Sequence, residues 1–209
     1  MTQERDEADD GAFKGVPTDA AISAARVIRS GGAVIYPTET VYGIGADALS
    51  EAAVARVFAI KCRQMDRPLF LAVSSFEMLS EVALVEPDEM AILRKLLPGP
   101  IAFLLRKKPH VPDILTAGSP FVGIRFPDHE LALALIEEAG PITSSSANIT
   151  GHLPPVRASE VDRVLASRVE MVMDGGRCRY AIPSTLVDLA NKKILRAGAL
   201  ADRVREELR

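Results

Sequence analysis

Hydroxyl-bearing side chains gather in two short segments of the sequence. Residues 36–40 read YPTET, so that Thr38, Glu39 and Thr40 follow a short apolar run, and residues 141–151 read PITSSSANITG. Two hydroxyls and a carboxylate suit a small polar molecule that bears hydroxyl and amino groups, although a capped turn has the same composition. The serine run fits either an exposed linker or a loop at the end of a buried strand that faces a ligand.

Basic side chains offer the complementary chemistry. Lys61, Arg63 and Arg67 fall where a predicted helix ends and before a predicted strand begins. Arginine forks bind phosphate or carboxylate oxygens bidentately, whereas cations at a helix end can also merely complement its dipole. Arg125 and Arg196 each end an apolar run. A single arginine of this kind is usually solvated, but these two and the cluster could converge on one anionic ligand.

Three other chemistries find little support in the sequence. Residues 43–48 match a GxGxxA dinucleotide fingerprint, but polar residues separate them from the preceding strand and the next helix cap comes later, at Ser50. The serine run has no nucleophile elbow, and its one nearby base, His152, has no third member of a triad. Cys62 and Cys178 are far apart without companion ligands, which predicts free thiols and no metal site.

Composition limits the class of protein. The chain has 209 residues, of which 48% are hydrophobic, and this is enough for a sizeable core. Its net charge of −3 gives it no overall nucleic-acid footprint. No apolar run approaches the roughly 18–20 residues of a membrane helix. The acidic residues 1–13 resemble neither a signal nor a transit peptide. We therefore expect a disordered lead-in, followed by a cytoplasmic domain with no membrane partner.

Strand-like and helix-like segments alternate along the chain. This predicts one α/β domain over residues 14–209, with a twisted mixed sheet flanked by helices. Strands are predicted at residues 33–37, 69–73, 101–105, 121–125, 169–173, 184–189 and 192–196, with a further strand ending at 141–142. Helices are predicted from Thr18 to Ser30, from Ser50 to Ile60, after a Ser74–Glu77 capping box, from Pro87 to before Pro98, from Asp128 to Gly140, after a Ser159–Asp162 capping box and after Gly198.

Seven motifs occur in a fixed order: GGAVIYPTETVYGIGADA, KCRQMDRPL, LLPGPIAFLL, VGIRFPDH, PITSSSANITGHLP, IPSTLVDL and ILRAG. Together they resemble the Sua5/YciO/YrdC family from about residue 20 to about residue 200. The resemblance implies a twisted sheet around a large open cavity. It also implies a nucleotidyltransferase that makes L-threonylcarbamoyladenylate and pyrophosphate from L-threonine, bicarbonate and ATP, with Mg²⁺ on the phosphates. The product would serve threonylcarbamoylation of tRNA at the adenosine next to the anticodon, with tRNA and other tRNA-modification proteins as possible partners.

The resemblance also implies roles for individual residues, but no general base and no metal ligand. The expected ATP-binding residues are Lys61, Arg63, Arg67, Ser146, Asn148 and Arg196. The expected threonine-binding residues are Thr40, Arg125, Ser144 and Ser184. The expected catalytic set is Lys61, Arg63, Ser146 and Asn148. If the serine run is extended, alternation places Ser144 and Ser146 on one side and Ser145 on the other.

Gln64, Arg67, Ala72 and Ala102 stand where the family often has other residues. They leave open a YciO-like paralogue that binds RNA or tRNA without catalysis. A carbamoyl-adenylate transfer enzyme is a further alternative, although the zinc-finger and acylphosphatase modules that usually accompany it are missing. The sequence resembles the short YrdC-like form rather than the form with an additional C-terminal Sua5 domain.

Overall fold

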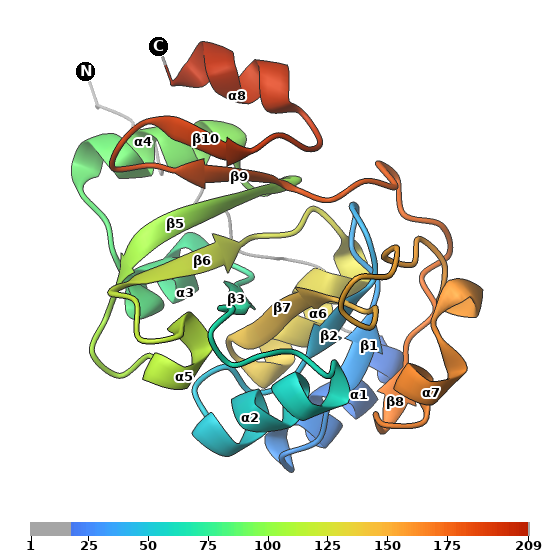
Figure 1. Ribbon diagram of the computed structural model, residues 1–209. Coiled ribbons are helices and arrows are strands. Elements are labelled where there is room, and N and C mark those ends of the chain that lie inside the picture. The colour runs from blue at the N-terminus through green and yellow to red at the C-terminus, as the bar shows by residue number, and fades with distance from the viewer. Residues whose placement is uncertain (1–17, 209) are drawn as a thin grey trace, which may run out of the picture.

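A ten-stranded, strongly twisted sheet forms the centre of the protein (Figure 1). The computed structural model describes residues 18–208, so the predicted lead-in over residues 1–13 lies outside the described part of the chain. The strands are β1 (Val34–Tyr36), β2 (Gly43–Gly45), β3 (Phe70–Ala72), β4 (Ala83–Leu84), β5 (Ile101–Lys107), β6 (Phe121–Arg125), β7 (Ile142–Ser146), β8 (Met171–Val172), β9 (Thr185–Asp188) and β10 (Lys193–Arg196).

The sheet is mixed, as the sequence predicts. Its order is β10-β9-β5-β6-β3-β7-β2-β1-β8, with β4 paired to β5. The pairs β1–β8, β3–β6 and β5–β9 are parallel, and the other pairs are antiparallel. Strands from both halves of the sequence therefore alternate in the middle of the sheet, which brings the ends of β3, β6 and β7 close to the loop between β1 and β2.

Helices cover both faces of the sheet (Figure 1). They are α1 (Asp19–Arg29), α2 (Glu51–Ile60), α3 (Phe76–Val82), α4 (Pro87–Leu96), α5 (Asp113–Thr116), α6 (Glu130–Ala139), α7 (Arg163–Ala166) and α8 (Ala201–Glu207), with a 3₁₀ turn at Ala158–Glu160. None of the helices over residues 18–208 is long and apolar enough to cross a membrane. The sheet and the helices on its two faces confirm the expected α/β architecture.

Two hydrophobic clusters lie on opposite sides of the sheet. In β1, Val34 and Tyr36 pack with the buried faces of α1 and α6, while Ile35 packs in the larger cluster that contains α2 and α3. This alternation is the two-residue period of a strand buried on both faces. It explains why the run that starts at Ala33 carries no polar residue before Thr38.

Several helix ends match the expectation and three do not. Thr18 and Ser50 cap α1 and α2, each accepting a hydrogen bond from the backbone N–H three residues on. The capping box Ser74–Glu77 was a wrong prediction: Ser75 caps α3, because Ser75 has the extended backbone that a cap requires, and the Ser74 hydroxyl donates to Glu137 instead (2.8 Å).

The caps predicted at Asp128 and at Ser159–Asp162 were also wrong. The Asp128 carboxylate pairs with Arg179 (2.5 Å), and His129 is the N-cap of α6, without a side-chain hydrogen bond to the helix. Asp162 caps α7 alone, with its carboxylate accepting from Val164 and Leu165. Ser159 lies within the 3₁₀ turn. The sequence pattern indicates that a serine or aspartate lies near these helix starts. It does not indicate which residue has the backbone conformation of an N-cap.

One strand extends beyond what the sequence predicts, and two short strands and one short helix were not predicted. Residues 141–142 were expected to end a strand, but Ile142 begins β7, and the serines continue it to Ser146. β2 was missed, since two of its three residues are glycines with low strand propensity. A glycine stands at position 43 because the Tyr36 ring lies close to it: a Cβ on Gly43 would be 3.1 Å from the ring. The short β4 and α5 were also not predicted.

Candidate active site

An open cleft lies where the β1–β2 loop meets the ends of β3, β6 and β7. Its wall is formed by Thr38, Thr40, Val41, Tyr42, Gly43, Arg63, Pro68, Leu69, Phe70, Arg125, Ser144, Ser145, Ser146, Pro183, Ser184 and Arg196. Seven of the residues expected from the sequence are therefore brought to one place: Thr40, Arg63, Arg125, Ser144, Ser146, Ser184 and Arg196.

The loop between β1 and β2 supplies hydroxyl groups on the wall of the cleft. The Thr38 Oγ1 atom lies 2.9 Å from Thr40 Oγ1, donates to the Val41 carbonyl (2.6 Å) and accepts from the N–H groups of Thr40 and Val41 (both 3.2 Å). Thr38 and Thr40 are 5% and 3% exposed. The loop is thus held rigidly from within, with both hydroxyls bordering the cleft.

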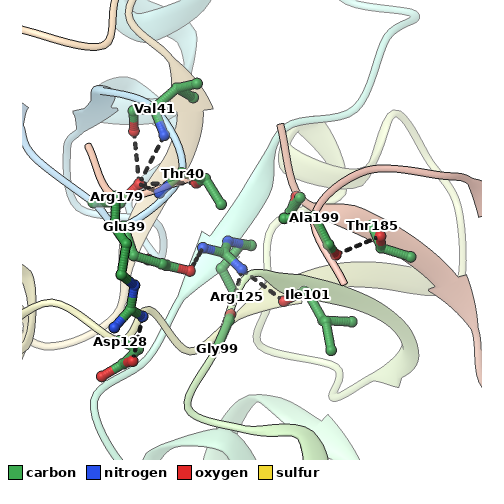
Figure 2. A network of polar contacts seen from close by, with 12 residues as sticks. Glu39, Thr40, Val41, Gly99, Ile101, Arg125, Asp128, Arg179, Thr185 and Ala199 are labelled. Carbon is green, nitrogen blue, oxygen red and sulfur yellow. Dashed lines mark hydrogen bonds and ion pairs between the residues drawn. The ribbon is translucent and has the colours of Figure 1, made fainter. Parts of the chain in front are cut away.

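Arg125 is buried at the end of β6 and is fixed by three groups. Figure 2 shows its guanidinium between Glu39 on one side and Gly99 and Ile101 on the other. Arg125 Nη2 lies 2.6 Å from Glu39 Oε1, and Nη1 donates to the carbonyls of Gly99 (2.6 Å) and Ile101 (2.8 Å). A guanidinium has five N–H donors, and these contacts use three of them. Two donors remain for a ligand in the cleft that Arg125 borders.

Glu39 lies in a position that the sequence did not predict. Its carboxylate was grouped with the threonines as part of a ligand site, but it turns inward, is 1% exposed and neutralises Arg125. Its second oxygen, Oε2, is buried without a hydrogen-bond partner among the described residues. The available signal was the charge of Arg125 at the end of an apolar strand, since a buried charge requires a partner.

Lys61 lies behind the cleft rather than on its wall. Its side chain is 2% exposed, and its Nζ donates to the carbonyl of Ser146 and to that of Asn148 (2.9 Å). Burial, together with the smaller effect of the charge of Arg63, lowers the pKa of Lys61 from 10.5 to about 7. Lys61 therefore ties the end of α2 to the segment that follows β7.

The Asn148 side chain also makes its hydrogen bonds to the backbone of the protein. Its Nδ2 donates to the carbonyls of Ile149 (3.0 Å) and His152 (2.8 Å), while its Oδ1 is buried without a partner in the described part of the chain. The Asn148 side chain thereby closes the loop after β7. Lys61 and Asn148 together fix the backbone just beyond Ser146.

Arg63 borders the cleft and is braced by its own neighbours. Its Nε donates to the Arg67 carbonyl (3.0 Å) and its Nη2 to the Pro68 carbonyl (2.9 Å). Burial lowers the pKa of Arg63, and the charge of Arg67 lowers it further. Arg67 itself is exposed, and its backbone rather than its side chain holds Arg63. The segment after α2 is a turn, with Cys62 at a positive φ of 49°, and not a continuous extended strand.

Arg196 and Ser184 close the opposite side of the cleft. Arg196 Nη2 donates to the Ser184 carbonyl (3.0 Å) and lies 3.4 Å from the Ser184 hydroxyl. Desolvation lowers the pKa of Arg196, and the charge of Arg125 lowers it further, so the two guanidiniums share one electrostatic environment. Gly198 permits this arrangement, because a Cβ there would stand 2.2 Å from the Pro183 carbonyl oxygen.

The chain is similar in sequence and structure to known proteins of one family. A family model for Sua5/YciO/YrdC, described as "Telomere recombination", matches residues 26–198. The chain belongs to the Sua5/YciO/YrdC family. It is 43% identical over 181 residues to the threonylcarbamoyl-AMP synthase of Pyrococcus abyssi, covering 85% of this chain and 53% of that protein. The chain thus spans about half the length of this relative.

Solved structures of the family agree with the fold. The structure of P. abyssi Sua5 in complex with L-threonine superposes with a TM-score of 0.84 at 40% identity, covering 90% of this chain and 58% of that one. The structure of E. coli YciO superposes with a TM-score of 0.78 at 25% identity, covering 86% and 89%. The chain therefore shares its α/β fold with the Sua5 and YciO structures over most of its length.

The sequence predicts four departures from the family, and two of these positions lie in the core. Ala72 on β3 and Ala102 on β5 are both 0% exposed, and neither borders the cleft. Gln64 and Arg67 are exposed in the turn after α2. Ala72 and Ala102 both pair in register with Arg125, and the turn after α2 holds Arg63, so these positions lie next to two arginines of the cleft wall.

The three serines of β7 all border the cleft and are partly exposed. Ser144 pairs with Phe70 of β3, and Ser145 pairs with Ile44 of β2. The serine run is therefore neither an exposed linker nor a loop, but the end of a central strand. The expected contrast between Ser145 and its two neighbours stays a prediction.

Proposed function

We propose that this chain is a threonylcarbamoyl-AMP synthase that uses L-threonine, bicarbonate and ATP. One observation carries the proposal: a single cleft brings Arg63 and Arg196 together with Arg125, Thr40 and Ser184. The first pair suits the phosphates of ATP, and the second set suits an amino acid with a carboxylate and an amine. The name of the P. abyssi relative and its complex with L-threonine support the same assignment.

The threonine end of the cleft is preorganised. The two remaining donors of Arg125 would receive the amino-acid carboxylate, while Glu39 and the carbonyls of Gly99 and Ile101 hold the guanidinium still. Since Glu39 already compensates the charge of Arg125, this contact supplies direction more than net charge. Thr40, Ser144 and Ser184 would complete the amino-acid site.

The nucleotide end would be formed by Arg63 and Arg196, with Ser146 between the two substrates. Lys61 and Asn148 would act on ATP through the backbone that they fix beyond Ser146. Within residues 18–208 no group of three or more His, Cys, Asp or Glu side chains could hold a metal ion. Magnesium would therefore be carried to the cleft on the triphosphate, where it reduces the phosphate charge.

The proposed reaction needs positioning more than proton transfer. The neutral amine of threonine attacks the carbon of bicarbonate, an N–C bond forms and water leaves, which gives a carbamate. A carbamate oxygen then attacks the α-phosphorus of ATP, the bond to the β-phosphate breaks, and pyrophosphate leaves. Arg63 and Arg196 would stabilise the charge that develops on the phosphates. In the cytoplasm, the adenylate would be passed to tRNA by other modification proteins.

A direct assay tests this proposal. The protein is incubated with ATP, L-threonine, magnesium and labelled bicarbonate, and we expect pyrophosphate together with a labelled adenylate. Omission of threonine should abolish both products. Arg63→Ala should abolish turnover, whereas Arg205→Ala, a change on the exposed surface of α8, should leave it intact. Silence of the wild-type protein with threonine, serine and other amino acids would refute the proposal.

A further inference from the structure

The hydroxyl groups of Thr38 and Thr40 form a chain with only one possible direction. Thr38 Oγ1 lies 2.6 Å from the Val41 carbonyl oxygen, and a carbonyl can only accept. A hydroxyl has one proton, so the proton of Thr38 is committed to Val41. Thr38 Oγ1 can then only accept from Thr40 Oγ1, which lies 2.9 Å away.

This direction decides what Thr40 can offer to a ligand. The single proton of Thr40 points to Thr38, away from the cleft, so that only lone pairs of Thr40 Oγ1 are left to face it. Both residues are almost fully buried, at 5% and 3% exposure, so water does not readily replace either partner. The two backbone N–H groups that also donate to Thr38 Oγ1 make longer contacts, 3.2 Å each, than the 2.9 Å contact with Thr40 Oγ1.

We infer that Thr38 is a positioning residue that turns Thr40 into an obligate acceptor for the amino group of the substrate. The inference rests on the proposed function, since it assumes an amino acid in the cleft. An ammonium or amine bonded to carbon presents N–H donors, whereas a ketone oxygen in the same place can only accept. An acceptor-only Thr40 therefore selects amino acids over the corresponding keto acids. Thr38 exerts this selection without touching the substrate.

A matched pair of ligands isolates this effect. L-2-aminobutyrate and 2-oxobutyrate differ at one position, where the first has the amino group and the second a ketone oxygen. Neither carries the hydroxyl of threonine, which could rotate to suit either polarity. Their affinities are measured by displacement of labelled L-threonine from the full chain. The quantity of interest is the ratio of the two affinities in each variant, because a general loosening of the cleft would weaken both ligands alike.

Thr38→Val removes the hydroxyl with little change of shape, which frees the proton of Thr40 to face the cleft. We expect the ratio of amine to ketone affinity to fall about fivefold or more, the equivalent of one neutral hydrogen bond. Thr38→Ser, which retains the hydroxyl, should keep the wild-type ratio. An unchanged ratio in Thr38→Val would overturn the inference, as would an equal fall in Thr38→Ser.

A second variant protects the test from a folding defect. Thr40→Val removes the acceptor itself but leaves the contacts of Thr38 with Val41 in place. It should lower the ratio as well, and an unchanged ratio would again contradict the inference. The proposed function is tested separately by product formation in the wild-type protein. If the wild-type protein makes the adenylate while the ratio is insensitive to Thr38, only the inference on polarity fails.

Discussion

Arg125 and Glu39 form a buried ion pair beside the cleft, with 2.6 Å between Nη2 and Oε1. The two side chains are 5% and 1% exposed. Glu39→Leu should destabilise the fold by about 3–5 kcal/mol, because it leaves an uncompensated buried cation. Glu39→Gln keeps an oxygen acceptor and should cost less, but it should still raise the KM for threonine. Urea unfolding and steady-state kinetics measure both effects.

The matched control for this ion pair is the exposed pair formed by Asp202 and Arg205 on α8. Exposed pairs contribute little to stability, so Asp202→Ala should leave the midpoint of urea unfolding unchanged. If Glu39→Leu proves as mild as Asp202→Ala, then Glu39 does not hold Arg125 in the way that its contacts indicate.

Lys61 should make stability depend on pH. Its pKa is about 7 in the folded protein and 10.5 when unperturbed, so between these values the unfolded chain binds more protons. The free energy of unfolding should therefore rise with pH across this window, by about 2 kcal/mol from pH 7 to pH 9. Lys61→Met lacks the titrating group, so its unfolding free energy should lack this increment. Parallel urea titrations of both proteins test this, and equal increments would contradict it.

Arg63 and Arg67 should differ sharply in their effect on ATP. Arg63 borders the cleft, and its loss should weaken ATP binding by about 10- to 100-fold, as expected for charge-assisted hydrogen bonds. The side chain of Arg67 is exposed, and only its carbonyl supports Arg63. Arg67→Ala should therefore change the Kd for ATP by much less, as isothermal titration calorimetry would show. Equal losses would place the Arg67 side chain on the phosphates as well.

The serines of β7 should contribute unevenly. Ser146→Ala should weaken nucleotide binding by about fivefold, the loss of one neutral hydrogen bond. Ser145 also borders the cleft, but alternation along β7 would turn its side chain to the face opposite those of Ser144 and Ser146, so Ser145→Ala should be mild. Asn148→Ala should also impair nucleotide use, because it releases the carbonyls of Ile149 and His152. Binding titrations with the three variants decide this, and equal losses in Ser145→Ala and Ser146→Ala would reject the alternation.

The sequence predicted the elements that depend on local pattern. Thr18 and Ser50 cap their helices, Pro87 begins α4, and the apolar runs that form β1, β3, β5 and β6 are strands. It failed where long-range pairing overrides local propensity. The GIG segment becomes β2 because β1 and β7 pair on either side of it, and the serines become a strand because Phe70 and Ile44 face them.

The sequence by itself determined the family and the set of side chains that could serve a polar, anionic substrate. The order and spacing of its motifs were sufficient for that, because they are properties of the chain alone. Only the tertiary structure decided what each side chain does. It places Arg63, Arg125 and Arg196 on one cleft, but turns Glu39 to Arg125 and Lys61 to the backbone. The physical reason is that the partner of a buried charge is fixed by how distant strands pack, which no local pattern records.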